Sequence, residues 1–491
     1  MFESAELGHK VARRTYDRQA PLLREALLDA QFELAKSKAF QVIILIGGVD
    51  GAGKGETVNT LNAWMDPRHI RTNAMGAPSD EERERPPMWR FWRALPPKGS
   101  IGIFFGSWYT APIIDRVSHR TRDADLEKSV DEIKRFEHML SDEGALILKF
   151  WFHLSKKQQK ARLKALQKDP RNRWRVTDTD WERYKHYDQF RKVSERTLRH
   201  TSAAHAPWFV IEGLDEGYRN LTVGRAILDA LKQRLTASKR IPATLEPAPL
   251  PVVDNLHLLN SLDLSLKLRK GTYRTELEKY EGRLNLLTRD TRFKQKSVVI
   301  LFEGNDAAGK GGAIRRITGS LDARYYQVVP VAAPTDEERA QPYLWRFWRH
   351  LPRLGRVTVF DRSWYGRVLV ERVQGFCSQS DWLRAYSEID DFEEEMASHN
   401  ILVVKFWLAI GADEQLRRFK ERQGTGFKRF KLTPEDWRNR KRWDDYVRAV
   451  CDMVDRTSTE IAPWTLVEAN DKYYARIKVL RTVCERIEAG L

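Results

Sequence analysis

Gly304-Asn305-Asp306-Ala307-Ala308-Gly309-Lys310-Gly311 is the stretch that decides the fold, and the chain carries a second version of it. That version, Gly48-Val49-Asp50-Gly51-Ala52-Gly53-Lys54-Gly55, lies 256 positions earlier. Each follows a short apolar run that predicts a strand. A glycine-rich loop with a lysine after a strand is typical of a P-loop, in which backbone N–H groups and a helix N-terminus meet phosphate oxygens. The chain is therefore predicted to be a tandem duplication of a phosphate-handling lobe.

The two halves of the chain stay in register over long distances. Lys149 aligns with Lys405 and Trp208 with Trp464, each pair 256 positions apart. Short apolar runs alternate with longer polar segments of helical period, which indicates an α/β fold with a mainly parallel sheet covered by helices. The predicted strands are Val42–Ile46, Ile101–Phe105, Ala145–Phe150 and Trp208–Ile211, with Val298–Phe302, Val357–Phe360, Ile401–Phe406 and Thr465–Val467 as their counterparts.

A proline-rich segment separates the halves. Residues 241–251 carry four prolines, which exclude a regular helix, so this segment is predicted to be a stiff linker. The chain then consists of a first lobe over residues 1–240 and a second lobe over residues 252–491.

The charge balance points to an anionic partner. The 491 residues carry a formal net charge of +17 and a sequence pI near 9.6, so long-range attraction should concentrate polyanions at the surface. Nucleic acid, acidic lipid and phosphate polymers all fit this charge.

Cysteine usage and hydropathy bear on the compartment. Cys377, Cys451 and Cys484 lack the paired spacing of a zinc site or a disulfide framework. No apolar stretch approaches the roughly 20 residues that span a bilayer, and Met1-Phe2-Glu3-Ser4 does not resemble a signal peptide. We therefore expect a soluble, cytoplasmic protein with no membrane partner.

The loop of the second half departs from the common P-loop in a way that affects metal binding. Gly311 follows Lys310, whereas the common version places there a Ser or Thr hydroxyl that holds magnesium. Asp306 inside the loop and Asp361 at the end of a later strand are hard oxygen ligands that could replace it. The sequence thus predicts an Mg²⁺ site at these two carboxylates. The alternative is a glycine-rich turn whose aspartate only caps the following helix.

Two arginines follow Asp361 in the sequence. If a helix starts after Asp361, the guanidinium groups of Arg362 and Arg367 would face the phosphates and neutralise charge that develops during transfer. Arg362 is the stronger candidate. Arg367 could instead pair with Glu371 four residues on, as in an ordinary exposed helix pair.

A basic stretch of the second half offers further anion ligands. It spans residues 417–438 and contains Arg422, Lys428 and Lys431 close to two glycines. Glycines beside a cationic cluster predict a mobile lid that closes over a phosphate chain and excludes water. A solvated charged surface is the alternative.

Several motifs of the second half together resemble the polyphosphate kinase 2 family. They are Gly304–Gly312, residues 335–339, residues 343–348 and Phe360–Arg367. The resemblance covers essentially the whole chain as two fused family domains, which is the arrangement of the two-domain class, the polyphosphate:AMP phosphotransferases. In that class the C-terminal domain is taken to be catalytic.

The resemblance implies a tandem duplicated P-loop kinase fold with a helical lid in each lobe, Mg²⁺ as cofactor, and transfer of the terminal phosphoryl group of inorganic polyphosphate to AMP, giving ADP. AMP as acceptor, rather than ADP or a guanine nucleotide, rests on this resemblance alone. On this interpretation the catalytic residues are Asp306, Lys310, Asp361 and Arg362. The phosphate-binding residues are Gly304, Asn305, Ala307, Ala308, Gly309, Gly311, Gly312, Arg367, Arg422, Lys428 and Lys431.

The first half departs from the family pattern where the chemistry would occur. Phe105, Gly106 and Ala111 stand where the second half has one aspartate and two arginines, and Glu56 replaces a loop glycine. Loss of a metal carboxylate together with a charge-stabilising arginine should remove several kcal/mol of transition-state stabilisation. The first lobe is therefore predicted to be non-catalytic.

Two other functions fit parts of the sequence. An ATP-dependent P-loop kinase for nucleotides or small molecules would use the same loop. A nucleic-acid-binding nucleotide switch would use the positive charge and the 16 tryptophans, but no RNA- or DNA-binding motif is recognisable, so nucleic acid is not an expected partner. The expected partners are inorganic polyphosphate and AMP or ADP, and a homo-oligomer of the fused chain is compatible with the sequence.

Overall fold

The computed structural model describes residues 1–171, 173–238, 258–426 and 432–491. The chain divides into two compact units. Each unit holds one sheet, and each also includes a short segment from the other sequence half, 334–345 in the first unit and 79–89 in the second. The linker expected at 241–251, with the domain boundaries at its two ends, lies outside the described residues.

The first sequence half contains five strands. They are β1 (Val42–Gly48), β2 (Ile70–Ala74), β3 (Ile101–Phe105), β4 (Leu146–His153) and β5 (Trp208–Glu212). Its helices are α1 (Arg13–Ser37), α2 (Lys54–Trp64), α3 (Asp80–Arg83), α4 (Trp89–Ala94), α5 (Thr110–Val117), α6 (Asp123–Asp142), α7 (Lys156–Lys168), α8 (Asp178–Lys185), α9 (Tyr187–Thr201) and α10 (Glu216–Ser238), with a 3-10 turn η1 (Phe2–Ala5) before them.

The second sequence half repeats this order. Its strands are β6 (Ser297–Gly304), β7 (Tyr326–Pro330), β8 (Val357–Asp361), β9 (Ile401–Ala409) and β10 (Trp464–Glu468). Its helices are α11 (Lys270–Arg289), α12 (Lys310–Gly319), α13 (Asp336–Arg339), α14 (Trp345–Trp348), α15 (Val370–Gln374), α16 (Gln379–Ser398), α17 (Ala412–Gly424), α18 (Pro434–Lys441), α19 (Trp443–Thr457) and α20 (Lys472–Gly490), with a 3-10 turn η6 (Trp364–Arg367).

The two sheets have the same parallel topology. Their strand orders are β2-β3-β1-β4-β5 and β7-β8-β6-β9-β10, as the predicted duplication requires. The strand that precedes each glycine loop, β1 or β6, lies at the centre. The strand order reverses there, and ligands of open α/β sheets bind in the crevice outside the carboxyl ends of the strands at such a point.

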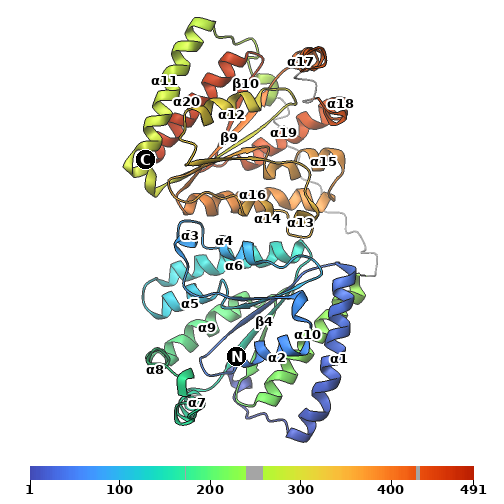
Figure 1. Ribbon diagram of the computed structural model, residues 1–491, viewed down its shortest axis with the longest axis vertical. Coiled ribbons are helices and arrows are strands. Elements are labelled where there is room, and N and C mark those ends of the chain that lie inside the picture. The colour runs from blue at the N-terminus through green and yellow to red at the C-terminus, as the bar shows by residue number, and fades with distance from the viewer. Residues whose placement is uncertain (172, 239–257, 427–431) are drawn as a thin grey trace. The chain divides into compact units, whose positions relative to one another are not determined.

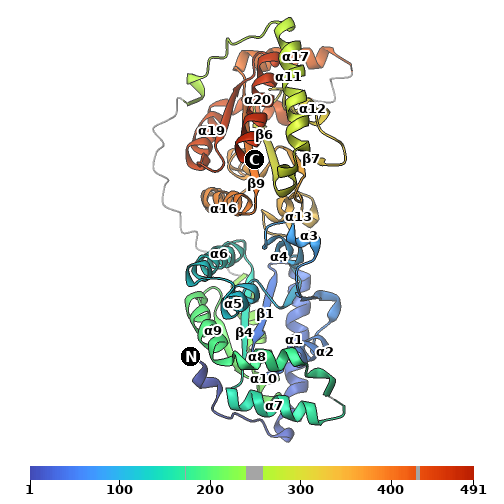
Figure 2. The same ribbon diagram turned by 90° about the vertical axis from the view of Figure 1, so that its left-hand side faces the viewer.

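Helices cover both faces of each sheet, which confirms the predicted fold class. In the first unit α1, α2 and α10 lie on one face and α5, α6 and α9 on the other (Figure 1, Figure 2). In the second unit α11, α12 and α20 face α16 and α19 across the sheet (Figure 1, Figure 2). Because the central strands are buried on both faces, they are continuous apolar runs, and Val42–Ile46 is at most 2% exposed throughout.

Two strands were not predicted from the sequence because of their position in the sheets. β2 and β7 are edge strands, and most of their side chains are exposed or half-buried. The sequence Ile70-Arg71-Thr72-Asn73-Ala74 therefore lacks the apolar run that marked the other strands. The eight strands predicted from apolar runs are all present.

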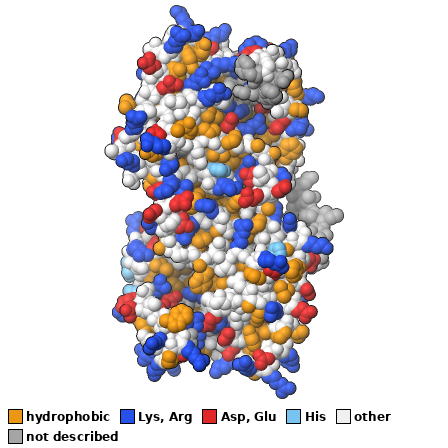
Figure 3. Space-filling view, viewed as in Figure 1, with side chains coloured by type: hydrophobic (Ala, Val, Ile, Leu, Met, Phe, Trp, Pro, Cys, Tyr) orange, Lys and Arg blue, Asp and Glu red, His pale blue; other side chains and the backbone are white. Residues whose placement is uncertain are grey.

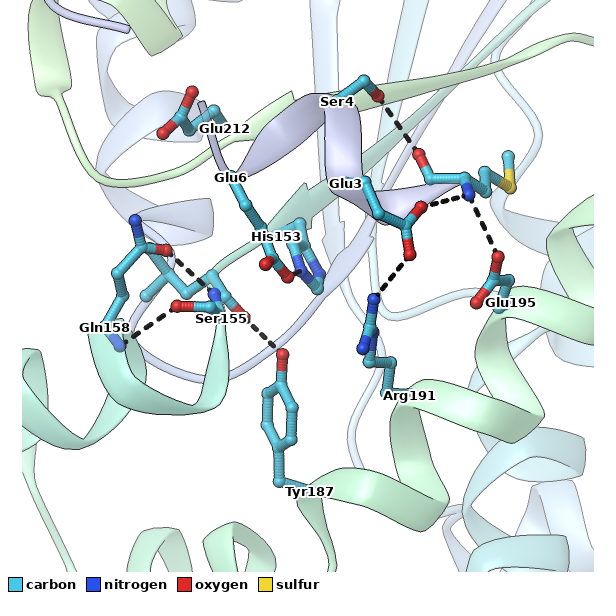
Figure 4. A network of polar contacts seen from close by, with 12 residues as sticks. Glu3, Ser4, Glu6, His153, Ser155, Gln158, Tyr187, Arg191, Glu195 and Glu212 are labelled. Carbon is cyan, nitrogen blue, oxygen red and sulfur yellow. Dashed lines mark hydrogen bonds and ion pairs between the residues drawn. The ribbon is translucent and has the colours of Figure 1, made fainter. Parts of the chain in front are cut away.

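The N-terminal segment packs on the carboxyl end of β4. Phe2 is 1% exposed and stacks on the ring of His153, with ring centroids 4.5 Å apart. His153 Nε2 lies 2.8 Å from a carboxylate oxygen of Glu6 (Figure 4). Burial lowers the pKa of His153. The second half has the aligned turn η4 (Leu258–Ser261) without these contacts, since Leu258, Leu262 and Ala409 align with Phe2, Glu6 and His153.

None of the helices in the described ranges is both long and apolar enough to cross a bilayer.

Candidate functional site

The glycine loop of the second half connects β6 to α12 and is tied to β9. Gly304 has φ +146°, and a Cβ there would lie 2.5 Å from the carbonyl oxygen of Leu408, so only glycine fits. The Asn305 amide donates to Leu408 O at 3.1 Å, and Asn305 Oδ1 accepts from Ile410 N at 3.1 Å. Lys310 Nζ donates to Gly304 O at 2.8 Å. The loop is thus held in its shape before any ligand arrives.

The second acidic residue reaches the loop through the strand register. Phe302 of β6 pairs with Asp361 of β8, and the amide of Arg362 donates to Phe302 O at 3.0 Å. Asp361 therefore lies beside the start of the glycine loop. No helix begins directly after it: Arg362 has a left-handed φ of +66°, and the 3-10 turn η6 begins at Trp364.

An ion pair and a hydrogen bond hold Asp306 in place. Arg362 Nη2 lies 3.2 Å from Asp306 Oδ1, and Asn439 Nδ2 of α18 donates to Asp306 Oδ2 at 2.9 Å. Gln415 Nε2 of α17 donates to the backbone oxygen of Asp306 at 3.2 Å. Although burial opposes it, the carboxylates of Asp306 and Glu303 raise the pKa of Arg362. The loop, the turn after β8 and two helices thus converge on one carboxylate.

Lys310 lies among these charges. Burial and the neighbouring Arg362 lower the pKa of Lys310, whereas the carboxylates of Asp306 and Asp361 act in the opposite direction.

A third carboxylate, Glu303, was missed by the sequence analysis. Glu303 is the residue before Gly304, is 6% exposed, and accepts a hydrogen bond from Ser363 Oγ at 2.9 Å. Burial raises the pKa of Glu303. A comparison of the two halves could have identified Glu303. Its counterpart in the first half is Gly47, and that half also lacks the counterparts of Asp361 and Arg362.

A cleft of about 700 Å³ opens in front of the loop. Asp306, Lys310, Asp361 and Arg362 all line it, together with the loop residues from Ala307 to Gly312. The structure thus brings the four predicted catalytic residues to one cleft. Gly304 and Asn305 are not among its lining residues. They connect the loop to β9 through the contacts described above.

Besides Lys310, Arg362 and the buried Arg418, four arginines and one lysine from three helices line the cleft. They are Arg315 and Arg316 of α12, Arg422 of α17, and Lys472 and Arg476 of α20. Lys and Arg side chains gather in the upper part of the second unit in the view of Figure 3. Only Arg422 of this set was predicted from the sequence. The aligned residues of the first half are Asn59, Thr60, Leu166, Glu216 and Asn220, so the comparison of halves could have identified the rest.

Among the predicted basic ligands in the described residues, Arg367 does not line the cleft. Arg367 Nε pairs with Glu371 at 2.9 Å, which was the alternative considered for it. Lys428 and Lys431 lie outside the described residues.

A buried polar cluster anchors the turn that carries Arg362. Trp364 Nε1 and Tyr365 Oη donate to Glu393 Oε1 at 3.0 and 2.8 Å, and Lys405 Nζ donates to Glu393 Oε2 at 2.7 Å. Lys405 also donates to the backbone oxygen of Thr457 at 2.7 Å. Burial raises the pKa of Glu393 and lowers that of Lys405. The first half repeats the cluster with Trp108, Tyr109, Glu137, Lys149 and Thr201.

The equivalent loop of the first half is closed by its own side chains. Glu56 lies 3.4 Å from Arg162, 3.0 Å from Arg175 and 3.0 Å from Arg219. Glu56 and Arg219 align with Gly312 and Ala475, which both line the cleft of the second unit. A carboxylate of the chain itself therefore pairs with the arginines near this end of the loop.

Comparisons with known proteins extend over the whole chain. The family model "Polyphosphate kinase 2 (PPK2)" matches residues 10–239 and 267–490. A polyphosphate:AMP phosphotransferase of Pseudomonas aeruginosa is 60% identical over 491 residues, covering 100% of this chain and 99% of that protein. A polyphosphate:AMP phosphotransferase of Acinetobacter johnsonii is 38% identical over 471 residues, covering 94% and 95%. A crystal structure described as a polyphosphate kinase 2 from Pseudomonas aeruginosa is 57% identical, with a TM-score of 0.90 over 100% of this chain and 99% of that one.

Proposed function

The chain belongs to the polyphosphate kinase 2 family, and we infer that it transfers the terminal phosphoryl group of inorganic polyphosphate to AMP, giving ADP. The observation that carries this function is the full-length identity to proteins named polyphosphate:AMP phosphotransferase. The duplicated P-loop fold and the cleft in the second unit, which all four predicted catalytic residues line, agree with it.

The charge of the cleft supports polyphosphate as the donor. A nucleoside triphosphate ends after three phosphates, whereas Arg315, Arg316 and Arg476 extend the cationic surface beyond Lys310. A long phosphate chain can use such a surface, because each phosphate brings its own negative charge. The net charge of +17 would also raise the encounter rate with such a polyanion.

We assign roles in the transfer to Lys310 with the loop backbone, to Arg362 and to Asp306. Lys310 and the backbone N–H groups of the loop hold the donor phosphates at the N-terminus of α12. Arg362, fixed by Asp306, neutralises charge that develops on the transferred group. Because the acceptor oxygen of AMP is already ionised at neutral pH, positioning and charge neutralisation suffice, and no covalent enzyme intermediate is needed.

The donor set at the cleft fits Mg²⁺. The described residues contain no group of three or more acidic, His or Cys side chains that could hold a metal. Asp306 and Asp361 line one cleft, however, and Mg²⁺ typically uses one or two carboxylates together with phosphate oxygens and water. Each oxygen of Asp306 keeps a second lone pair beyond its present bond. We propose that these two residues hold Mg²⁺, which would neutralise charge on the phosphate oxygens when bound.

The remaining assignments complete the proposal. The loop residues Gly304, Asn305, Ala307, Ala308, Gly309, Gly311 and Gly312, together with Arg367, Arg422, Lys428 and Lys431, are proposed as phosphate ligands or as their direct support. Residues 252–491 form the catalytic domain, 241–251 the linker and 1–240 a non-catalytic domain. We also propose a cytoplasmic location, which is supported by the three cysteines, none of which forms a disulfide in the described residues. Assembly of the chain into a homo-oligomer is part of the same proposal.

Purified full-length protein, AMP, Mg²⁺ and polyphosphate test the function directly. ADP should appear with polyphosphate as the only donor, and initial rates should be highest with AMP among nucleoside mono- and diphosphates. Full transfer from ATP with no ADP formed from polyphosphate would contradict the donor and favour an ATP-dependent kinase. Binding of labelled single-stranded RNA that added polyphosphate does not displace would favour a nucleic-acid-binding switch.

A further inference from the structure

The first unit contains a cavity of about 440 Å³ that the catalytic proposal does not use. Asp50 and Lys54 of the glycine loop line one side of it, and α5 lines another. Trp151, Tyr187 and Phe190 contribute aromatic surface. The volume falls within the range of small-molecule sites, which is about 300–1,000 Å³.

The cavity exists because the first unit lacks two side chains that, in the second unit, extend across the equivalent space. Gly106 aligns with Arg362, whose guanidinium reaches Asp306 at 3.2 Å. Tyr184 aligns with Arg440, which donates to Gln415 Oε1 at 3.2 Å. Gly106 has φ +82°, and a Cβ there would lie 2.7 Å from the backbone oxygen of Met75. The first unit therefore lacks the guanidinium groups of Arg362 and Arg440 at this place.

Two buried polar atoms at the cavity have no hydrogen-bond partner within the described ranges. They are the indole N–H of Trp151 and the Oε1 atom of Gln159, and both residues line the cavity and are 3% exposed. Gln159 keeps its bond from Nε2 to the backbone oxygen of Asp50 at 3.0 Å. A buried polar group without a partner costs about 1–3 kcal/mol. A ligand that offers one acceptor and one donor would remove both costs.

The aromatic wall is held in place before a ligand binds. Tyr187 Oη donates to the backbone oxygen of Leu154 at 2.7 Å (Figure 4). Trp151 stacks on Phe190, with ring centroids 5.7 Å apart and an interplanar angle of 24°. Such a wall favours a flat ring, since stacked aromatic pairs contribute about 0.5–1.5 kcal/mol beyond their buried area.

The charges at the cavity suit one phosphate rather than a chain of phosphates. Lys54 and Arg183 both line the cavity and lie 3.4 and 3.5 Å from Asp50, which leaves one positive charge in excess. The basic residues that would guide a polyphosphate chain are replaced in this half, and Glu56 already pairs with Arg219 at 3.0 Å. A short anion can therefore reach Lys54, whereas the path of a longer one is closed.

We propose that this cavity binds a purine nucleoside monophosphate that is not turned over. The base lies against the aromatic wall, with its edge hydrogen-bonded to Trp151 and Gln159, and the phosphate lies at Lys54. A purine edge offers the donor and the acceptor that the two buried atoms lack. This second nucleotide site goes beyond the reaction of the second unit and does not depend on it.

Photolabelling of the full-length protein with 2-azido-AMP, in the absence of polyphosphate, tests the proposal, because peptide mapping identifies the labelled unit. Peptides from residues 105–118 or 183–190 should be labelled with a saturable dependence on concentration, and unlabelled AMP should compete. Labelling confined to peptides of the second sequence half would overturn the proposal. ADP formation is measured separately, so failure of the reaction and failure of this site are distinguishable.

Two variants with matched controls sharpen the test. Trp151→Phe keeps an aromatic ring, smaller than the indole, but removes the N–H donor, and should raise the AMP concentration that half-protects the first-unit peptides about tenfold. Trp407→Phe, the aligned change in the second half, should leave that concentration unchanged. Ile114→Trp fills the cavity from α5 and should abolish labelling of the first unit. If Ile114→Trp prevents folding, the pair of Trp→Phe variants still decides, and an equal effect of both would contradict the proposal.

Discussion

At the scale of single residues, Arg362 combines a costly backbone conformation with a central position in the cleft. Its φ of +66° lies in the left-handed region, which costs a non-glycine residue about 1–3 kcal/mol. Gly106 occupies the aligned position of the first half with φ +82°, so that half has lost both the guanidinium and the strain. The left-handed turn is retained in both halves, whereas the functional side chain is retained in one.

Substitution of Arg362 should therefore separate activity from stability. Arg362→Ala and Arg362→Gly both remove the guanidinium, and each should lower ADP formation at least about 100-fold. Because glycine tolerates the left-handed conformation, Arg362→Gly should be up to about 1 kcal/mol more stable than Arg362→Ala. Denaturant unfolding of the two variants measures this difference. Equal stability would show that the backbone at this position is not strained.

Asp390 of α16 predicts a pH dependence of stability. Burial, with the nearby charge of Glu393, raises the pKa of Asp390 to about 7, and its Oδ1 has no partner among the described residues. Since the folded-state pKa is above the unfolded one, this group favours folding while protonated, and its contribution is lost as the pH rises from about 4 through 7. Asp390→Asn should thus be more stable than the natural protein at pH 8, by about 1–3 kcal/mol, and similar to it at pH 4.

The control for this prediction is Asp455→Asn on α19, which changes an exposed aspartate. Melting temperatures of all three proteins between pH 4 and pH 8 make the comparison. The prediction fails if Asp390→Asn and the natural protein lose stability in parallel over this range.

At the scale of elements, the duplicated buried cluster around Glu393 offers an internal control. Glu393 holds both Trp364 and Tyr365 of the turn that follows Arg362, and Glu137 makes the same contacts in the first half. The two clusters have the same local chemistry, but only one of them lies next to a complete cleft.

Removal of the two carboxylates should have equal effects on stability and unequal effects on activity. Glu393→Gln and Glu137→Gln each leave a buried lysine without its ion pair, which costs about 3–5 kcal/mol. Glu393→Gln should in addition lower kcat, because the turn that places Arg362 loses its anchor. Calorimetry and initial rates at saturating AMP measure the two effects. A purely structural role for Glu393 would appear as an equal change in kcat for both variants.

The helices and strands also show which structural features can be predicted from local sequence patterns. Eight strands and the helices before and after the glycine loops follow from apolar runs and from glycine at positive φ, both of which act over a few residues. β2 and β7 could not be found in this way, because an edge strand is stabilised by its neighbour rather than by its own apolar run.

At the scale of the whole molecule, the two homologous units differ within the described residues, since Asp361 and Arg362 of the second have Phe105 and Gly106 as their counterparts in the first. Asp361→Asn should abolish ADP formation while the fold stays intact, since the second unit loses a proposed metal ligand. Asp50→Asn, in the loop of the first unit, should leave most of the activity. Rates and circular dichroism of both variants test this division. Equal loss of activity would mean that both units take part in the transfer.

The candidate site was predictable where its residues are close in sequence. Asp306, Lys310, Asp361 and Arg362 fall in two short motifs after strands, and the carboxyl ends of neighbouring parallel strands meet at one edge of the sheet. Arg315 and Arg476 were not predicted, because they come from α12 and α20, and their approach to the same cleft depends on how these helices pack. Glu303 was missed because an apolar strand end gave no reason to expect a buried acid.

The sequence by itself determined the duplication, the parallel α/β architecture, the glycine loops and the half that keeps the acidic and basic residues. These features depend on residue type and on short periodic patterns, both of which can be identified in the sequence alone. Only the tertiary structure decided which cationic side chains share the cleft of the second unit and that Glu56 of the first unit pairs with Arg219. It also decided that a cavity lies beside Gly106, the counterpart of Arg362. Such features arise where residues far apart in sequence meet, and packing between elements sets those distances.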